Sequence, residues 1–286
     1  MSVVSINQLR DYASLFSRGV ALDWFHSDFT NINHKIERYD KNRFAKSTKT
    51  YLDYLKYAYQ TIEQNYPTEY VYKNAFLNEW LIKELGEVNA KVFSEFRLGK
   101  TVADLVMFNG VSKVFEIKTA FDTVKRLDNQ IESYKNIFNE IYLIVPQSKV
   151  EQYLAYEESI GIISFSNERE QKFELERKPV RNLNIEPRCL MNVLHTNEYK
   201  NIVKTYFQEL PPMNSFNQFK ICADLMAQIP VKTLNELFIK QLKNRGVENT
   251  FSSRTHLAFN QLSLALKLGK TERELLFQNL KTPIQL

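Results

Sequence analysis

Glycine and proline, the residues that most often end helices and form turns, are scarce in this chain. Seven of its 286 residues are glycine and eight are proline. An all-β sandwich or barrel needs a turn about every 8–12 residues, so this composition argues against one and favours long helices. The chain is 44% hydrophobic and 25% charged, which is typical of a globular protein and excludes disordered and collagen-like chains. At roughly 150 residues per domain, its length predicts about two domains.

Cysteine usage and hydropathy exclude further classes of protein. Cys189 and Cys222 lie far apart and neither has a CxxC partner, so we expect neither a disulfide framework nor a zinc ribbon. No run of 18 apolar residues occurs, and residues 1–10 lack a basic segment followed by an apolar one, so we expect no signal peptide. We therefore expect no membrane partner and a reducing cytoplasm as the compartment. The sequence also lacks HxH, HExxH, GxGxxG, GxxxxGK[ST] and GxSxG motifs, which leaves zinc hydrolases, nucleotide-binding loops and α/β-hydrolases without support.

Helical periodicity marks both ends of the chain. Apolar residues recur at helical spacing between 51 and 62, and the same period returns in 181–286. The polar segment 31–49 is expected to be a loop. In the C-terminal part, Thr233 and Thr271 each precede a glutamate by three residues, which predicts two helix starts with capping boxes.

The middle of the chain changes from helical to strand periodicity. Thr68 is the expected N-cap of a helix that reaches Leu85, with Gly86 as its stop. Strands are then predicted over 91–98, 101–108, 111–118, 141–145 and 160–165, and further helices over 123–138 and 149–158. This order predicts an α/β fold, a mixed sheet with helices packed on it. We divide the chain into a helical N-terminal region (1–65), a core (66–180) and a helical C-terminal domain (181–286).

Charge is distributed unevenly among these three regions. The net charge is +2 in 1–65, −3 in 66–180 and +6 in 181–286. An acidic centre beside a basic region suits a metal site that meets a polyanionic substrate. A solvated surface of mixed charge is the alternative.

Three charged residues in the predicted strands are the strongest indication of chemistry. Glu116 and Lys118 are two residues apart, so they point to the same side of an otherwise apolar strand. Charges in such a place are costly unless they are paired or used. Asp104 comes from the preceding strand, and two carboxylates with a main-chain carbonyl would suit Mg²⁺ or Mn²⁺. The adjacent lysine could hold or deprotonate a water molecule. The alternative is a surface ion pair between Glu116 and Lys118.

The hairpin between the two strands decides whether this site can form. A two-residue loop at Asn109 and Gly110 would place Asp104 and Glu116 on opposite faces of the sheet. A three-residue loop over 108–110, with Gly110 at positive φ, restores the required parity. We therefore predict an odd-numbered loop or a bulge.

With these residues in place, the sequence resembles the PD-(D/E)XK nucleases, a superfamily with a restriction-endonuclease-like fold. The motif is Asp104, then Glu116-x-Lys118 on a hairpin, although position 103 is alanine where the motif has proline. Gln130 and Tyr134 on the next helix fit the QxxxY motif of the RecB and phage-exonuclease branch. The resemblance implies metal binding by Asp104 and Glu116 and catalysis with Lys118. It further implies that Gln130 orients the site and that Tyr134 supports it or contacts nucleic acid.

Other charged residues are weaker candidates for the same site. The superfamily often places a glutamate of the first helix on the metal, which would be Glu79, although Glu84 and Glu87 are nearby and Glu79 could instead pair with Lys83. Glu95 could be a further ligand or pair with a cation. Basic residues expected to contact phosphate are Arg126, Lys240, Lys243, Arg245 and Arg254.

Together these features predict a magnesium-dependent nuclease that hydrolyses phosphodiester bonds, with DNA as the expected substrate and partner. One alternative is a nucleic-acid-binding or regulatory module that keeps the fold without turnover. Another is a defence or mobile-element effector that is active only in a complex. The helical regions would bind substrate, a protein partner or a second copy of the chain.

Overall fold

The computed structural model of this protein describes residues 4–44, 48–85, 90–120, 122, 127–246, 249, 251 and 255–286. The chain forms two compact units, each assembled from separate stretches of sequence. Unit 1 contains residues 1–82, 167–172 and 247–286, and unit 2 contains residues 83–166 and 173–246. The segment 181–286, expected as one helical domain, therefore contributes to both units.

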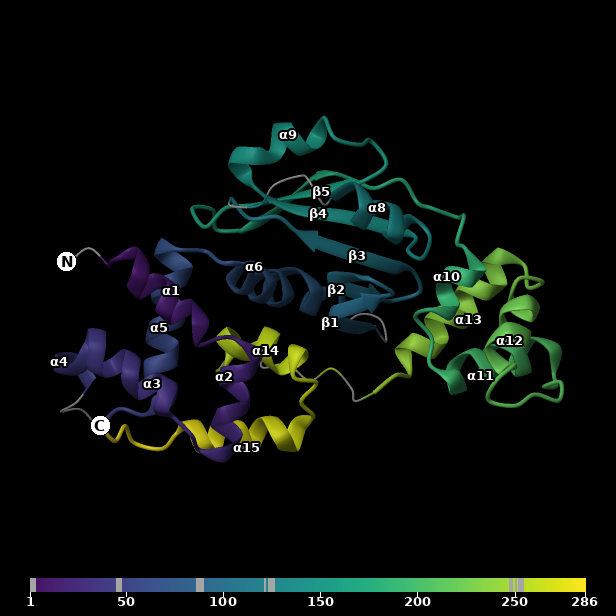
Figure 1. The fold of residues 1–286 in the computed structure, drawn as a ribbon. Coiled ribbons are helices and arrows are strands. Elements are labelled where there is room, and N and C mark those ends of the chain that lie inside the picture. The colour runs from purple at the N-terminus through teal and green to yellow at the C-terminus, as the bar shows by residue number, and fades with distance from the viewer. Residues whose placement is uncertain are drawn as a thin grey trace. The chain divides into compact units, whose positions relative to one another are not determined.

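Unit 2 is built on a six-stranded mixed sheet within the described part of the chain (Figure 1). The spatial order equals the chain order: β1 (Lys91–Leu98), β2 (Thr101–Phe108), β3 (Ser112–Ile117), β4 (Glu140–Pro146), β5 (Gly161–Phe165) and β6 (Phe173–Arg177). The pairs β3–β4 and β4–β5 are parallel and the other neighbours are antiparallel. The α/β class and the first five strands were predicted from the sequence, whereas β6 was not.

The β2–β3 hairpin has the predicted odd loop, one residue later than expected. Phe108 pairs with Ser112, which leaves a three-residue loop over 109–111. Gly110 in this loop has a φ of 99°, a value that glycine adopts without strain. In this register residue 104 stands opposite residue 116.

Two helices connect the parallel strands and cover one face of the sheet. They are α8 (Leu127–Lys135) between β3 and β4, and α9 (Val150–Leu154), which follows the short helix η5 (Gln147–Lys149). Successive parallel connections of the same hand place their helices on the same face. Accordingly, Tyr134 of α8 and Tyr153 of α9 are buried in one apolar cluster with alternate residues of β4.

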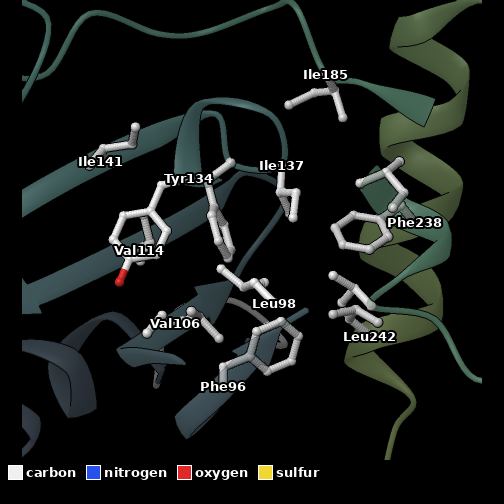
Figure 2. Packing of buried hydrophobic residues seen from close by; sticks show 14 of the residues in the cluster. Phe96, Leu98, Val106, Val114, Tyr134, Ile137, Ile141, Ile185, Phe238 and Leu242 are labelled. Carbon is white, nitrogen blue, oxygen red and sulfur yellow. The ribbon is translucent and has the colours of Figure 1, made fainter. Parts of the chain in front are cut away.

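Four helices complete unit 2: α10 (Pro187–Met191), α11 (Thr196–Phe207), α12 (Gln218–Met226) and α13 (Val231–Lys243). They share the apolar cluster of the sheet. Figure 2 shows Phe238 and Leu242 of α13 directed toward Phe96 and Leu98 of β1. The Phe238 and Phe108 rings meet edge to face, with centroids 5.8 Å apart. These helices therefore extend the core of the sheet.

Unit 1 is helical. Its N-terminal elements are α1 (Ile6–Ser14), α2 (Arg18–Asp23), η1 (Trp24–His26), α3 (Thr30–Lys35), η2 (Ile36–Asp40), α4 (Lys41–Phe44) and α5 (Tyr51–Asn65). They are followed by α6 (Glu69–Phe76) and η3 (Leu77–Leu81), and the C-terminal elements are η6 (Leu257–Phe259), α14 (Asn260–Ala265) and α15 (Lys270–Leu280). The short helix α7 (Ile82–Leu85) contains the boundary, because unit 1 ends at Ile82 and unit 2 begins at Lys83. Thr68 is the N-cap of α6, as predicted. The expected stop at Gly86 lies outside the described residues.

The expectation of a loop over 31–49 is wrong, because residues 30–44 are helical. Ile32, Ile36 and Phe44 recur at multiples of four and are buried, a helical spacing that the intervening charges obscure. Asp40 is buried as well, and its Oδ2 accepts hydrogen bonds from the hydroxyls of Tyr12 (2.6 Å) and Tyr54 (2.9 Å). The segment is polar in composition, but its helices have one buried face.

The two capping boxes predicted in the C-terminal part are also wrong. Helix α13 begins at Val231 after Pro230, and α15 begins at Lys270 after Gly269. Glu272, not Glu274, closes the start of α15, because its Oε2 accepts a hydrogen bond from the Gly269 N–H at 2.8 Å. Both helices therefore begin earlier than predicted, directly after a proline or a glycine, and Thr233 and Thr271 lie inside them. In the described residues no helix has the length and apolar character needed to cross a membrane.

Candidate metal and nucleic-acid site

Asp104 lies at an irregularity shared by β1 and β2. The pairs Ser94–Leu105 and Phe96–Ala103 flank the position where Glu95 stands opposite Asp104. Glu95 has a φ of 52°, in the left-handed region that non-glycine residues seldom adopt. As a result Phe93 and Phe96, three residues apart, both pack on the core, with ring centroids 5.3 Å apart. The register of the two strands is the same on both sides of this position, so the irregularity is a local change of backbone conformation without an inserted residue.

The Asp104 carboxylate reaches across to β3 where the two strands part. The ladder between β2 and β3 ends at Leu105–Phe115, and Asp104 Oδ2 accepts a hydrogen bond from the Ile117 N–H at 2.8 Å. The Lys118 N–H bonds to Ile144 of β4. Because successive residues of a strand direct their main-chain groups to opposite neighbours, the carbonyl of Ile117 points to the side of Asp104. A carboxylate oxygen of Asp104 and the main-chain carbonyl oxygen of Ile117 therefore lie on the same side of β3 at its end.

Glu116 is the centre of a hydrogen-bonded network with the other three predicted residues. Its Oε1 accepts from Lys118 Nζ at 2.8 Å and from Gln130 Nε2 at 2.7 Å, and its Oε2 accepts from the Tyr134 hydroxyl at 2.6 Å. Gln130 Oε1 in turn accepts from Lys118 Nζ at 3.0 Å. Gln130 and Tyr134 lie one turn apart on α8, so both reach the same carboxylate. The pair of Glu116 and Lys118, for which a surface ion pair was the alternative, is therefore buried and hydrogen-bonded within this network.

Burial makes this network energetically demanding. Glu116 and Lys118 are 3% and 7% exposed and Tyr134 is fully buried. Removing one member of a buried ion pair commonly costs about 3–5 kcal/mol, whereas apolar replacement of both is often neutral. Burial, followed by the charge and hydrogen bond of Glu116 and the charge of Asp104, raises the pKa of Tyr134 above its ordinary value. Tyr134 is therefore a hydrogen-bond donor at neutral pH, and both carboxylates act on its hydroxyl.

The segment after Lys118 is held by residues that the sequence did not single out for this purpose. Lys149 Nζ donates to the main-chain carbonyls of Thr119 (3.4 Å), Ala120 (2.8 Å) and Asp122 (3.2 Å). Asp122 Oδ2 accepts from the N–H and the hydroxyl of Thr119, both at 2.7 Å. Lys149 follows β4 and reaches the end of β3 only because these two strands are neighbours in the sheet. No local sequence pattern would therefore predict this contact.

Glu79, the expected third carboxylate, belongs to unit 1. Its Oε1 lies 3.2 Å from Lys172 Nζ, which also bonds to Glu63 at 2.9 Å. Glu79 thus pairs with Lys172. Glu95 is exposed. Among the described residues, no group of three or more histidine, cysteine, aspartate or glutamate side chains is placed to hold a metal ion.

The basic residues expected to contact phosphate have different surroundings. Arg245 is bound to Glu198 through Nε at 2.7 Å and through Nη2, and Nη2 also donates to the Val193 carbonyl at 3.0 Å. Lys240 and Lys243 are on α13, where they line a surface hollow of about 300 Å³ together with Glu236, Ile239 and Asn244. Arg126 and Arg254 lie outside the described residues.

The donors present at the end of β3 fit a magnesium ion. All are oxygen atoms: the carboxylates of Asp104 and Glu116 and the carbonyl of Ile117. Mg²⁺ is commonly held by one or two carboxylates, with water and substrate phosphate as its other ligands. A protein cage of three or more carboxylates is therefore not required by this chemistry.

Comparison with known proteins gives the family of the chain. The family model described as "Bacteriophage P4 protein cII" matches residues 60–265. This chain belongs to the bacteriophage P4 protein cII family. Protein cII of Enterobacteria phage P4 is 26% identical over 210 residues, which cover 70% of this chain and 78% of that protein. The match to the family spans the whole sheet and the helices α8 to α13.

A solved structure is also similar in part. It is the SPO1766 protein of unknown function from Silicibacter pomeroyi, at 13% identity and a TM-score of 0.32. The match covers 49% of this chain and 92% of that one.

Proposed function

We propose that this member of the P4 cII family is a metal-dependent nuclease of the PD-(D/E)XK type that hydrolyses phosphodiester bonds in DNA. The observation that supports the proposal is the arrangement at the end of β3. Asp104 is bonded there to the main chain of Ile117, between Glu116 and Lys118, and Glu116 accepts hydrogen bonds from Lys118, Gln130 and Tyr134. Free thiols at Cys189 and Cys222 agree with a reducing cytoplasm as its compartment.

Asp104 and Glu116 would hold the metal ion, and the carbonyl of Ile117 faces the same place. A bound Mg²⁺ would offset charge on the scissile phosphate and lower the pKa of a water molecule. Lys118 has three N–H donors, and in the part of the chain that is described two of them are used by Glu116 and Gln130. The third would be available to hold the attacking water or a phosphate oxygen.

The other two residues keep this arrangement in place. Gln130 bonds to both members of the Glu116–Lys118 pair, so it fixes the ammonium relative to the carboxylate. Tyr134 holds the second oxygen of Glu116. Both are positioning residues, because each acts through Glu116 or Lys118.

The test is nicking of supercoiled plasmid DNA by the purified chain in Mg²⁺ or Mn²⁺, with Lys118→Ala as the control. We expect metal-dependent nicking by the wild type and its loss in the variant. Equal nicking by both proteins would refute the assignment of Lys118.

A second candidate function is a nucleic-acid-binding module without turnover. It is favoured by one observation: both oxygens of Glu116 already accept hydrogen bonds from the protein. DNA binding by a chain that nicks neither DNA nor RNA in any divalent metal would support it over the nuclease.

A further inference from the structure

Phe216, on the loop before α12 in unit 2, is the most exposed large apolar side chain in the described residues, at 96%. Buried apolar surface is what normally holds such a ring in place, and here that surface is missing. Its neighbours along the chain are Asn214, Ser215, Asn217 and Gln218, all of which are polar. The ring is therefore almost fully exposed, and the residues that flank it in the sequence carry amide and hydroxyl groups.

The main chain beneath this ring is nevertheless firmly held. Asn214 Oδ1 accepts from the N–H of Phe216 at 2.9 Å and of Asn217 at 3.1 Å. Asn217 Oδ1 accepts in return from the Asn214 N–H at 2.7 Å. The Gln218 N–H bonds to the Asn214 carbonyl at 3.0 Å, which joins the turn to α12. Such Asn turns replace main-chain bonds and fix the backbone, so the turn presents the ring before any ligand arrives.

A second ring lies three residues further on. Phe219 is 48% exposed and meets Tyr199 of α11 edge to face, with centroids 6.2 Å apart. The exposed Lys220 follows it directly. Residues 187–246, which form α10 to α13, contain eight lysines and arginines and four acidic residues, a net charge of +4. The rings thus belong to a basic part of the molecule.

We infer that Phe216 is a stacking platform for a base of single-stranded DNA. Base stacking needs one accessible, preformed ring and a cationic surface for the phosphates. The core of a protein interface is instead apolar, whereas the residues that flank Phe216 in the sequence are polar. The inference deepens the proposed function by naming the form of the substrate, and it rests on that proposal for the choice of nucleic acid.

The experiment measures binding of the full chain to a fluorescein-labelled 20-nucleotide dT strand in EDTA, so that cleavage plays no part. Phe216→Ala is compared with Leu183→Ala, which removes a similarly exposed side chain (69%) elsewhere in unit 2. We expect Phe216→Ala to weaken binding about 5- to 100-fold and Leu183→Ala to leave it unchanged. Phe216→Trp should retain affinity, and the fluorescence of the introduced indole should be quenched by the strand.

Several results would overturn the inference. Two of them concern the alanine variants: equal binding by wild type and Phe216→Ala, or an equal loss of binding in Leu183→Ala. A third is tighter binding of duplex DNA or RNA than of the dT strand. The fourth is indole fluorescence that stays unquenched when Phe216→Trp does form a complex. Concentration-dependent self-association that is lost in Phe216→Ala, with no DNA binding, would assign the ring to a protein interface. The nuclease proposal is tested by plasmid nicking and the stacking platform by binding in EDTA. The failure of one proposal can therefore be distinguished from the failure of the other.

Discussion

The carboxylate of Asp104 and the main-chain N–H of Ile117 are joined by a 2.8 Å hydrogen bond at the point where β2 and β3 part. Asp104 thus has a structural task in addition to the proposed metal binding. Asp104→Asn keeps an oxygen that can accept the bond but removes the negative charge. We expect the variant to fold with nearly wild-type stability and to lose plasmid nicking by about 100-fold or more.

Calorimetric titration with Mn²⁺ and urea unfolding check this separation of roles. Asp104→Ala is the matched comparison, because it also removes the acceptor and should cost about 1–3 kcal/mol of unfolding free energy. Wild-type metal binding and nicking by Asp104→Asn would contradict the proposed role of the carboxylate.

The buried pair of Glu116 and Lys118 predicts a strong dependence of one substitution on the other. Lys118→Met leaves the buried Glu116 charge without its ammonium partner, and we expect a loss of about 3–5 kcal/mol. The double variant Glu116→Gln with Lys118→Met removes both charges and should recover most of that loss. Both variants should be inactive in nicking. Additive effects in urea unfolding would argue against the pair.

Tyr134 is expected to support the site without taking part in chemistry. Tyr134→Phe removes one hydrogen bond to the charged Glu116 but keeps the ring in the core (Figure 2). We expect a loss of about 1–3 kcal/mol and a 10- to 100-fold fall in nicking. The fall should be accompanied by weaker metal affinity, measured by titration. A loss of nicking as large as that of Lys118→Ala at saturating metal would instead place the tyrosine in the reaction.

The sequence predicted the core of the site because the information is local. The alternation of side chains along a strand places Glu116 and Lys118 on the same face. One helical turn places Gln130 beside Tyr134. Packing of this helix on the strand then completes the network. The parity of the hairpin followed from the need to bring Asp104 to Glu116. Its exact loop could not be predicted, since 108–110 and 109–111 have the same parity.

What the sequence could not predict depends on distant partners. Lys149 acts on the end of β3 only because β4 is its parallel neighbour. The left-handed conformation of Glu95 has no residue-type signal, since glycine or asparagine would be the expected sign. The sequence predicts a loop over 31–49 because Asp40 is polar, and the hydrogen bonds from Tyr12 and Tyr54 that allow its burial come from distant parts of the chain.

The basic residues near the end of α13 are expected to separate into two kinds. Arg245→Ala breaks the contacts with Glu198 and Val193, so it should lower the unfolding free energy by about 1–3 kcal/mol. Lys240→Ala and Lys243→Ala should leave stability within about 0.5 kcal/mol. If these lysines contact phosphates, each substitution should reduce the slope of log K for DNA binding against log salt concentration by about one. An unchanged salt slope in the double lysine variant would exclude that contact.

The stability of unit 1 is expected to fall at mildly acidic pH because of His256. Burial, together with the charges of Lys56, Lys281 and Arg273, lowers the pKa of His256 to about 4, whereas an unfolded histidine has a pKa near 6.5. Above pH 6.5 the ring is neutral in both states and has no effect on unfolding. Between pH 6.5 and 4 the unfolded chain binds a proton that the folded chain does not. Stability is therefore lost as the pH falls through this window.

The measurement is urea unfolding at pH 7.5 and 5.0, followed by tryptophan fluorescence. Both tryptophans, Trp24 and Trp80, belong to unit 1, so the signal reports the unit that contains His256. His256→Phe can keep the stacking on Phe277, whose ring centroid is 3.8 Å away, but it cannot be protonated. We expect the variant to lose on the order of 1 kcal/mol less than the wild type between the two pH values, after allowance for solvent screening. Identical losses would show that the histidine is protonated as easily in the folded chain as in the unfolded one.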